Sequence, residues 1–481
     1  MADFDLVIRN GTVATAADVF RADIGVAGGR ITAIAETLPK GTRDIDATDR
    51  LVLPGGVDAH CHIDQPSLTG AVCADDFRSG SISAACGGTT TIIPFAAQLK
   101  GQSLRAAVED YHRRAKGKSI IDYAFHLIIS DPTEQVLGQE LPALIRDGCT
   151  AFKIYMTYED LKLNDRQILD VLALARREGA MVMVHAENSD VINWLTDKLE
   201  AAGRTAPRYH GTSRPMPVER EATHRAISLA EIVGVPILIV HVSGREAIEQ
   251  IRWAQQRGIK IYAETCPQYL FLTEDDMAKE GFEGAKCVCS PPPRDKANQE
   301  VVWQALASGV FQVLSSDHSP TRYNDPKGKM ISGAKSSFRN IPNGVPGIET
   351  RMPLLFSGGV SEGRLELTRF VSLTATEPAR LYGLYPKKGT IAIGSDADIV
   401  IWDPKREVII TNEILHHDVD YTPYEGQKVR GWPVVVFSRG EEVCRDGKVV
   451  AAIGRGQFLP CDLPPAAQAR MPAALPEGVI A

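Results

Sequence analysis

The stretch Pro54-Gly55-Gly56-Val57-Asp58-Ala59-His60-Cys61-His62 is an apolar run that follows a turn signal and ends on two histidines. A short apolar run bounded by such a turn is typical of a buried strand. Side chains alternate across a strand, so residues two apart point to the same face. His60 and His62 can therefore reach one metal ion together, and this motif predicts a hydrolase with a metal centre.

The middle of the chain alternates apolar strand patterns with helical patterns. The clearest helix is predicted at residues 166–177, with Asn164 or Asp165 as its cap and Gly179 as its stop. The eight predicted strands cover residues 57–63, 89–95, 122–129, 150–156, 181–185, 236–241, 259–265 and 311–317. Eight strand–helix units predict an α/β fold with a TIM-type (β/α)8 barrel. A dinucleotide-binding fold is not supported, because no Gly-x-Gly-x-x-Gly follows an early strand.

Both ends of the chain have the pattern of short strands and tight turns. Asn10-Gly11 is a hairpin signal near the start, and Asp446-Gly447 is a similar one near the end. We therefore expect the two ends to form one accessory β-sandwich domain. The expected division is 1–54 and 381–458 for the two parts of this sandwich, 55–380 for the catalytic barrel, and 459–481 for an irregular C-terminal arm suited to packing on a partner subunit.

Composition narrows the function classes. Of the 481 residues 44% are hydrophobic and 23% charged, and the formal net charge is −7. An acidic chain is a poor partner for nucleic acid, and no apolar stretch is long enough to cross a bilayer. Residues 1–7 carry acids and no basic leader, so we expect no secretory signal. The nine scattered cysteines are then expected to be reduced, in a cytoplasmic protein.

Barrel enzymes build their sites at the carboxyl ends of the strands. Six side chains that suit a metal centre lie at or near such ends. They are His60 and His62 on the first predicted strand, Lys153 on the fourth, His185 on the fifth, His241 on the sixth and Asp317 on the eighth. Each alone has an ordinary alternative as a core or surface residue, but the joint placement predicts a metal site. Imidazole and carboxylate suit Zn²⁺ best, with Mn²⁺, Fe²⁺ and Co²⁺ also possible.

A lysine among metal ligands needs a chemical explanation, because an ammonium repels cations. Burial of Lys153 in an apolar strand should lower its pKa and make a neutral amine available. That amine can add carbon dioxide to give an anionic carbamate that bridges two metals. Asp317, in contact with one metal and the attacking hydroxide, is the natural proton shuttle. Of the remaining histidines, we expect His318 at most to support the ligands.

These residues identify a family resemblance that covers nearly the whole chain. The chain resembles the cyclic amidohydrolases of the amidohydrolase superfamily, most closely the D-hydantoinases, phenylhydantoinases and dihydropyrimidinases. The motifs that carry the resemblance are Gly55-Gly56-Val57-Asp58-Ala59-His60-Cys61-His62, Phe152-Lys153-Ile154-Tyr155-Met156-Thr157-Tyr158, Val184-His185-Ala186-Glu187-Asn188, Glu264-Thr265-Cys266-Pro267-Gln268-Tyr269, Ser290-Pro291-Pro292-Pro293-Arg294, Ser316-Asp317-His318, Gly344-Val345-Pro346-Gly347-Ile348-Glu349 and Asp420-Tyr421-Thr422-Pro423-Tyr424-Glu425-Gly426.

The resemblance implies a role for each site residue. One metal would be held by His60, His62 and Asp317, the other by His185 and His241, and carboxylated Lys153 would bridge them. Tyr158 would donate its hydroxyl to the substrate carbonyl and steady the oxyanion, and the backbones of Ser290 and Asn343 would bind the amide edge of the ring. The implied reaction opens a hydantoin or a 5,6-dihydropyrimidine to an N-carbamoyl amino acid. The implied assembly is a homotetramer.

The sequence departs from the subgroup's motifs at two places, and two alternative functions stay open. Cys61 stands where the subgroup usually has Thr, and Asp64-Gln65-Pro66-Ser67-Leu68 replaces the usual Asp-Met-Pro and aromatic residue. We expect the altered loop to change substrate range and stereochemical preference, not the metal chemistry. An allantoinase or dihydroorotase would share the metals, although Tyr158 and the segment 421–426 favour the hydantoinase group. A non-catalytic scaffold related to dihydropyrimidinases would have lost metal ligands, and all six are present.

Overall fold

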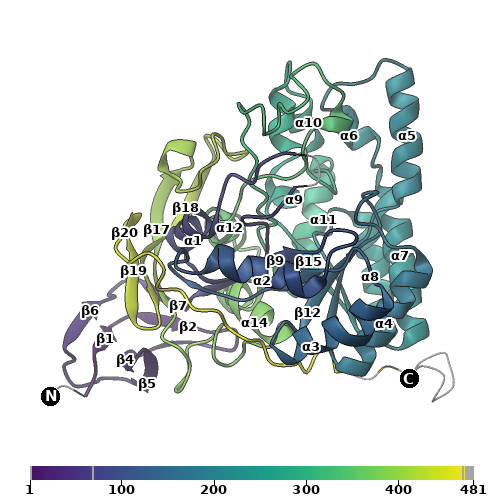
Figure 1. Ribbon diagram of the computed structural model, residues 1–481. Coiled ribbons are helices and arrows are strands. Elements are labelled where there is room, and N and C mark those ends of the chain that lie inside the picture. Colours follow the sequence, from purple (N-terminus) through teal and green to yellow (C-terminus); the bar gives the residue numbers. More distant parts are fainter. Residues whose placement is uncertain (1–2, 68–69, 469–470, 472–481) are drawn as a thin grey trace.

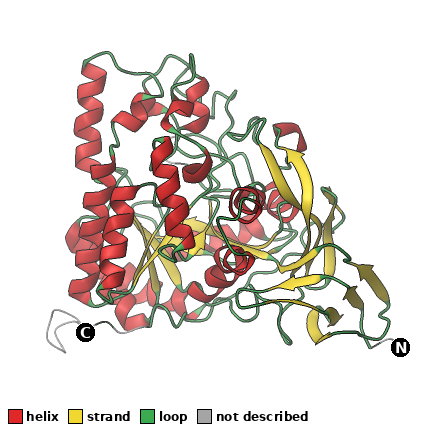
Figure 2. Ribbon diagram, turned by 180° about the vertical axis from the view of Figure 1, so that it is seen from behind, coloured by secondary structure: helices red, strands yellow, loops and turns green. Residues whose placement is uncertain are grey.

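The structure is a computed structural model that describes residues 3–67, 70–468 and 471. A barrel surrounded by helices occupies most of the molecule, and a group of mostly antiparallel strands lies against one side of it (Figures 1 and 2). Among the described residues, none of the helices is both long and apolar enough to cross a membrane.

Parallel strands in chain order form the barrel. They are β8 (Gly56–Cys61), β9 (Thr89–Ala97), β10 (Asp122–Tyr123), β11 (His126–Ile128), β12 (Ala151–Tyr155), β13 (Met181–His185), β14 (Ile237–Ile239), β15 (Ile261–Thr265) and β16 (Val313–Leu314). The third predicted strand is split into β10 and β11, because Tyr123 turns its N–H to the carbonyl of Gln457, 3.0 Å away. The sixth and eighth are shorter than predicted, because the backbone leaves the extended region at His241 and Asp317, which both have positive φ.

The barrel closes between its first strand and the segment that follows its last. Cys61 forms a parallel bridge with His318, and the N–H of His62 donates to the carbonyl of His318 over 2.7 Å. The carboxylate of Asp58 accepts the N–H of Ser316 at 3.1 Å. Eight strand positions therefore form a closed (β/α)8 barrel, which confirms the predicted fold class.

Helices cover the outside of the barrel (Figure 1). Their bounds are α1 (Phe77–Cys86), α2 (Leu104–Ala115), α3 (Leu141–Arg146), α4 (Asp165–Glu178), α5 (Ser189–Ala201), α6 (Tyr209–Thr212), α7 (Met216–Val233), α8 (Arg245–Gln256), α9 (Gln268–Phe271), α10 (Glu274–Met277), α11 (Lys296–Ala307), α12 (Arg351–Leu355), α13 (Leu367–Val371) and α14 (Glu377–Leu381). The predicted helix at 166–177 is α4. Asn164 and Gln167 form its capping box, and Gly179 ends it in the left-handed conformation.

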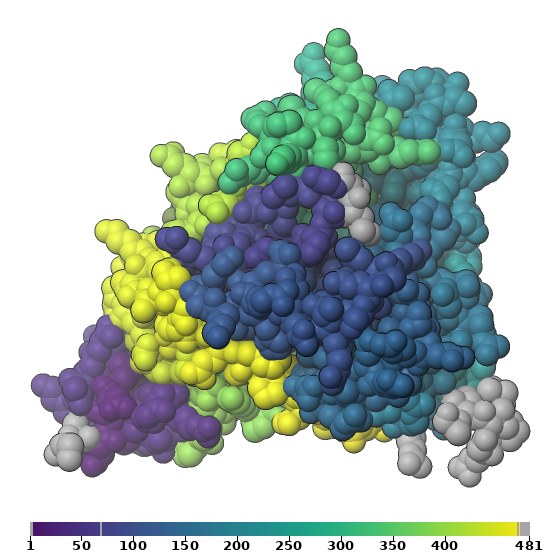
Figure 3. Space-filling model, viewed as in Figure 1, coloured from purple at the N-terminus to yellow at the C-terminus, as the bar shows by residue number. Residues whose placement is uncertain are grey.

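Strands from both chain ends form two accessory sheets. One sheet has the order β5-β4-β1-β6 and the other has the order β20-β19-β18-β17-β7-β2-β3. Their bounds are β1 (Leu6–Arg9), β2 (Thr12–Ala14), β3 (Val19–Arg21), β4 (Asp23–Ala27), β5 (Arg30–Ala35), β6 (Arg43–Asp46), β7 (Leu51–Pro54), β17 (Ile399–Ile409), β18 (Lys428–Ser438), β19 (Glu441–Arg445) and β20 (Lys448–Val449). The two sheets share one apolar core that includes Ile24, Val52, Ile399 and Phe437. Figure 3 shows the N-terminal part in purple beside the C-terminal part in yellow.

The C-terminal segment after β20 packs on the chain's own barrel up to residue 468. Cys461 donates its N–H to Gly148 at 3.0 Å, and Asp462 donates to Gly383 at 2.9 Å. Leu459 and Cys461 join the apolar residues inside the barrel. Of the predicted arm, residues 469–470 and 472–481 lie outside the described part.

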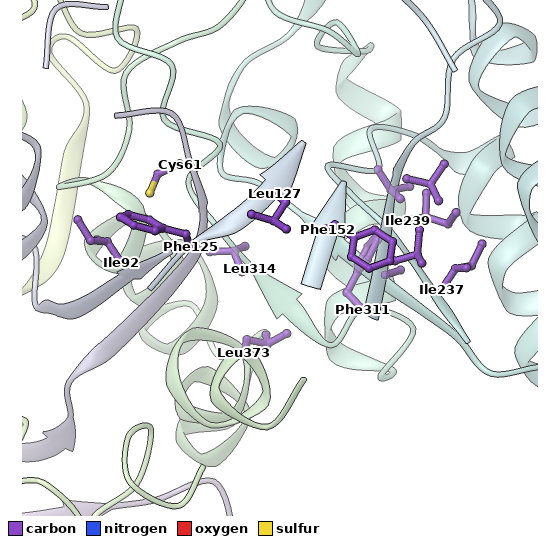
Figure 4. Packing of buried hydrophobic residues seen from close by; sticks show 14 of the residues in the cluster. Cys61, Ile92, Phe125, Leu127, Phe152, Ile237, Ile239, Phe311, Leu314 and Leu373 are labelled. Atoms are coloured by element: carbon purple, nitrogen blue, oxygen red, sulfur yellow. The ribbon is translucent and has the colours of Figure 1, made fainter. Parts of the chain in front are cut away.

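Side chains alternate between the two faces of the barrel strands. One face forms an apolar layer, and the other carries the candidate ligands. Figure 4 shows members of this layer, among them Phe152, Ile237 and Leu314. Phe152 belongs to this layer, whereas its neighbours Ala151 and Tyr155 belong to the cluster inside the barrel. Lys153 is one residue from Phe152, so its side chain points inward, as the period of two requires.

A buried guanidinium holds the seam of the barrel together at its other end. Arg351, in α12, is fully buried. It donates to the carbonyl of Leu314 and to the hydroxyl of Thr89, both at 2.9 Å, and its Nε lies 3.7 Å from the carboxylate of Asp58. The first, second and last strands therefore share one cation.

We expect the substitution Arg351→Met to lower the free energy of unfolding by about 3–5 kcal/mol, because it leaves Asp58 buried without its cation. Unfolding in urea, followed by circular dichroism, measures this change. The second substitution Asp58→Asn should recover part of the loss. Arg364→Met, which breaks the exposed pair with Glu300, is the control and should change the value by less than about 0.5 kcal/mol. An Arg351→Met protein as stable as this control would contradict the role of the seam.

Candidate metal centre

The first predicted ligand group meets at the carboxyl end of β8. The Nε2 atoms of His60 and His62 lie 3.1 and 3.2 Å from the same oxygen of Asp317. One donor atom of each of the three residues lies within 4.8 Å of the others. The pairing of His62 with the segment after β16 brings these residues together, since Asp317 precedes His318 in that segment.

The second predicted ligand group lies beside the first. His185 Nδ1 and His241 Nε2 are 2.9 Å apart. The Nζ of Lys153 lies 2.8 Å from His60 Nε2 and faces the ring of Tyr155. The Tyr155 ring also stacks on the ring of His185. The structure thus brings all six predicted ligands to one end of the barrel.

Burial sets the charge of these groups. The pKa values of His185 and His241 lie well below the usual value because both imidazoles are buried, so both are neutral and keep a lone pair. Burial opposes the ionisation of Asp317. His60 outweighs that effect through its charge and hydrogen bond, so the pKa of Asp317 falls well below its usual range. Burial between Phe95 and Tyr155 lowers the pKa of Lys153 to about 8.

The hydrogen bonds around the ligands fit a divalent cation. His60 Nδ1 donates to Glu264 Oε1 at 2.6 Å, and its Nε2 faces the oxygen of Asp317. His185 Nε2 donates to Glu187 Oε2 at 2.7 Å, so its Nδ1 turns a lone pair toward the nitrogen of His241. Lone pairs that face other electron-rich atoms repel one another unless a proton or a cation lies between them. The donor set, with imidazoles and a carboxylate, is the one that zinc and its neighbours prefer.

Two carboxylates that support the ligands were not predicted. Glu264 Oε1 also accepts the backbone N–H of His241 at 3.2 Å, so one carboxylate orients a ligand from each group. Glu187 holds His185 and lies 3.9 Å from Arg214. Both acids stand inside motifs that carry the family resemblance. The sequence signal of Glu187 is its place two residues after His185, and that of Glu264 is its place near the end of a barrel strand that carries no candidate ligand.

Gln65 corrects one expectation from the sequence. Its Oε1 lies 2.7 Å from His62 Nδ1, so this loop residue orients a predicted ligand. The departure after the first strand therefore touches the metal centre and not only the space for the ring substituent. His318 supports the site from behind: its Nε2 donates to Asp75 at 3.0 Å and its Nδ1 accepts the N–H of Gly347 at 3.1 Å.

The three residues expected to contact substrate also meet. Asn343 Nδ2 donates to the hydroxyl of Tyr158 at 3.3 Å, and Ser290 hydrogen-bonds to Tyr158 as well. A buried lysine that the sequence did not reveal joins their two loops. Lys329 Nζ donates to the carbonyls of Val288, Pro342 and Gly344 at 3.0, 2.7 and 2.7 Å. No pattern in the sequence sets this lysine apart from an exposed one.

Comparison with known proteins adds independent information. The profile of the amidohydrolase family matches residues 51–443. The D-hydantoinase of Rhizobium radiobacter is 46% identical, over 94% of this chain and 98% of that protein. The D-hydantoinase of Geobacillus stearothermophilus is 48% identical, over 94% and 96%. The crystal structure of dihydropyrimidinase from Brevibacillus agri NCHU1002 has a TM-score of 0.93 and 43% identity, and the match covers 96% of this chain and 99% of that one.

We expect Glu264→Gln to weaken zinc binding by roughly 10–100-fold, because the carboxylate that orients His60 and His241 is lost. Competition with a chelator of known affinity measures the change, with zinc followed by atomic absorption. Glu300→Gln, an exposed acid, is the matched control. Equal zinc affinity in the Glu264→Gln protein and the control would contradict the assigned role.

Proposed function

The chain belongs to the amidohydrolase family and is a cyclic amidohydrolase of the hydantoinase and dihydropyrimidinase group, and from this premise we propose that it opens hydantoins or 5,6-dihydropyrimidines to N-carbamoyl amino acids at a binuclear metal centre. The observation that carries the proposal is that the six candidate ligands lie at one end of the barrel beside Tyr158.

In this proposal His60, His62 and Asp317 would hold one ion, His185 and His241 would hold the other, and carboxylated Lys153 would be a ligand to both. The donor set supports zinc, with manganese, iron and cobalt as alternatives. When bound, the ions would activate water for attack at neutral pH and polarise the ring carbonyl.

Carboxylation of Lys153 is proposed from its surroundings. The side chain is 1% exposed and lies between two aromatic rings, which makes an ammonium costly. The neutral amine attacks carbon dioxide, a C–N bond forms, and the proton leaves the nitrogen. The product is an anionic carbamate, which attracts the cations that an ammonium would repel.

Asp317 and Tyr158 complete the proposed reaction. Asp317 is held ionised, so it can accept the proton of the attacking water and pass it to the ring nitrogen as the C–N bond breaks. The hydroxyl of Tyr158 would donate to the carbonyl oxygen as negative charge develops there. The backbones at Ser290 and Asn343 would bind the amide edge of the ring, on loops that Lys329 holds together.

The assembly of the protein and its compartment are a further part of the proposal. We propose a homotetramer in the cytoplasm. The nine cysteines are free thiols, which supports a reducing compartment. Light scattering after size exclusion measures the assembly.

We expect zinc-loaded protein to open 5-phenylhydantoin or dihydrouracil, detected as the N-carbamoyl product. Lys153→Ala should abolish turnover, and a small carboxylate such as acetate should restore part of it, because the carboxylate replaces the carbamate. Lys162→Ala, which removes a half-buried lysine paired with Glu159 and Asp190, is the control. Turnover of allantoin or dihydroorotate alone would reject the proposed substrate class, and full activity in Lys153→Ala would reject the bridging role.

The hydroxyl of Tyr158 should remain a donor over the whole usable pH range. Burial raises the pKa of Tyr158 to about 12, and the protonated form is the one that donates. We expect Tyr158→Phe to lower kcat/KM by roughly 10²–10³-fold, by the same factor at every pH up to about 11. A decline of wild-type activity near pH 10 that disappears in Tyr158→Phe would contradict this assignment.

A further inference from the structure

A second cluster of metal-ligating side chains lies where the barrel meets the accessory sheet. Cys86 ends α1 of the barrel, and Cys444 belongs to β19 of the sheet. Their sulfur atoms are 3.3 Å apart. Glu349 precedes α12, and His416 follows β17. One donor atom each of Cys86, Glu349 and His416 lies within 4.8 Å of the others.

The hydrogen bonds leave one ligand atom of His416 and one of Glu349 turned toward each other. His416 Nε2 donates to the carbonyl of Gly447 at 2.7 Å, which is the support that a metal-binding imidazole normally has on its second nitrogen. Its Nδ1 lies 2.9 Å from Glu349 Oε1. Glu349 Oε2 accepts the hydroxyl of Ser83 at 3.1 Å and the N–H of His416 at 2.8 Å. These bonds fix the carboxylate through one oxygen and direct the other toward the cluster.

The glycine after α1 allows this close approach of the backbones. A side chain at Gly87 would meet the backbone of Glu349 at 2.3 Å, so only glycine lets the end of α1 lie against that segment. The two thiols and the carboxylate are buried, whereas the His416 side chain is 27% exposed to solvent. A cation could therefore enter past His416 and be enclosed.

The spacing matches that of the catalytic centre. There the candidate ligand atoms lie 2.8–3.2 Å apart. In the second cluster the corresponding distances are 2.9 Å between His416 and Glu349 and 3.3 Å between the two sulfurs. A tetrahedral zinc ion with zinc–sulfur bonds of about 2.3 Å separates two sulfurs by about 3.8 Å, so the two sulfurs must move slightly apart. Cys444, which lies outside the group of three, must also turn toward His416 and Glu349 to complete the set.

We propose that Cys86, Cys444, His416 and Glu349 form a structural zinc site that ties the barrel to the accessory sheet and shares no residue with the catalytic centre. Two thiolates, an imidazole and a carboxylate make a four-coordinate set, the number that structural zinc requires. On binding, the two thiols release their protons to solvent, and the ion links four segments that are far apart in the sequence.

Cobalt substitution tests the proposal independently of the catalytic function. None of the six catalytic candidates is a cysteine, so a sulfur-to-cobalt charge-transfer absorption in the near ultraviolet can arise only from a thiolate site. We expect Co²⁺-loaded protein to show this absorption, and Cys444→Ala and Cys86→Ala each to lose it together with about one zinc equivalent per chain. Hydrolysis by the zinc-loaded variants should be retained. Cys149→Ala removes a buried thiol elsewhere and should keep the absorption.

Three results would overturn the site. One is the lack of the absorption in wild-type protein that binds cobalt elsewhere. Another is its persistence in both Cys86→Ala and Cys444→Ala. The third is a disulfide between Cys86 and Cys444, found by mass spectrometry in protein purified with a thiol reductant. If no cyclic amide is hydrolysed while the absorption is present and depends on both cysteines, the proposed function fails and the zinc site stands.

Discussion

Closure of the barrel between its first and last strands is the constraint on which the site depends. The bond from the N–H of His62 to the carbonyl of His318 fixes the register at one end of the seam, and the pair of Arg351 with Asp58 holds the other. Were this register to slip by one residue, the side chains after the last strand would exchange faces. Asp317 would then turn away from His60 and His62, and the first ligand group would be lost.

The candidate ligands are held in their orientations by carboxylates that are not themselves candidate ligands. Glu264 lies against His60 and the backbone of His241, so it couples the two ligand groups. Glu187 fixes the tautomer of His185. Such support has a physical cost, since these acids are buried. Neighbouring imidazoles and Arg214 offset it only in part, and one oxygen of Glu264 has no hydrogen-bond partner among the described residues. A cation in the centre would lower that cost.

Periodicity and side-chain chemistry were enough to predict that the six candidate ligands meet at one end of the barrel, whereas residues that act through long-range contacts were missed. The six candidates could be picked out because each stands near a strand end and has metal-binding chemistry. Lys329 was missed because its role comes from three carbonyls on distant loops, and nothing in its neighbourhood records them. The lengths of β14 and β16 were overestimated, since the predicted strands run on to His241 and Asp317, where positive φ takes the backbone out of the extended region. Gln65 was assigned to the substrate side alone because a loop pattern does not show which way a side chain turns.

The most direct test of the central claim is a crystal structure of the metal-loaded protein, with diffraction data collected at the absorption edge of zinc. The account predicts two anomalous peaks among His60, His62, His185, His241 and Asp317, with a carboxylated Lys153 between them. A bare lysine amine, with a single peak or none at this end of the barrel in fully active protein, would contradict it.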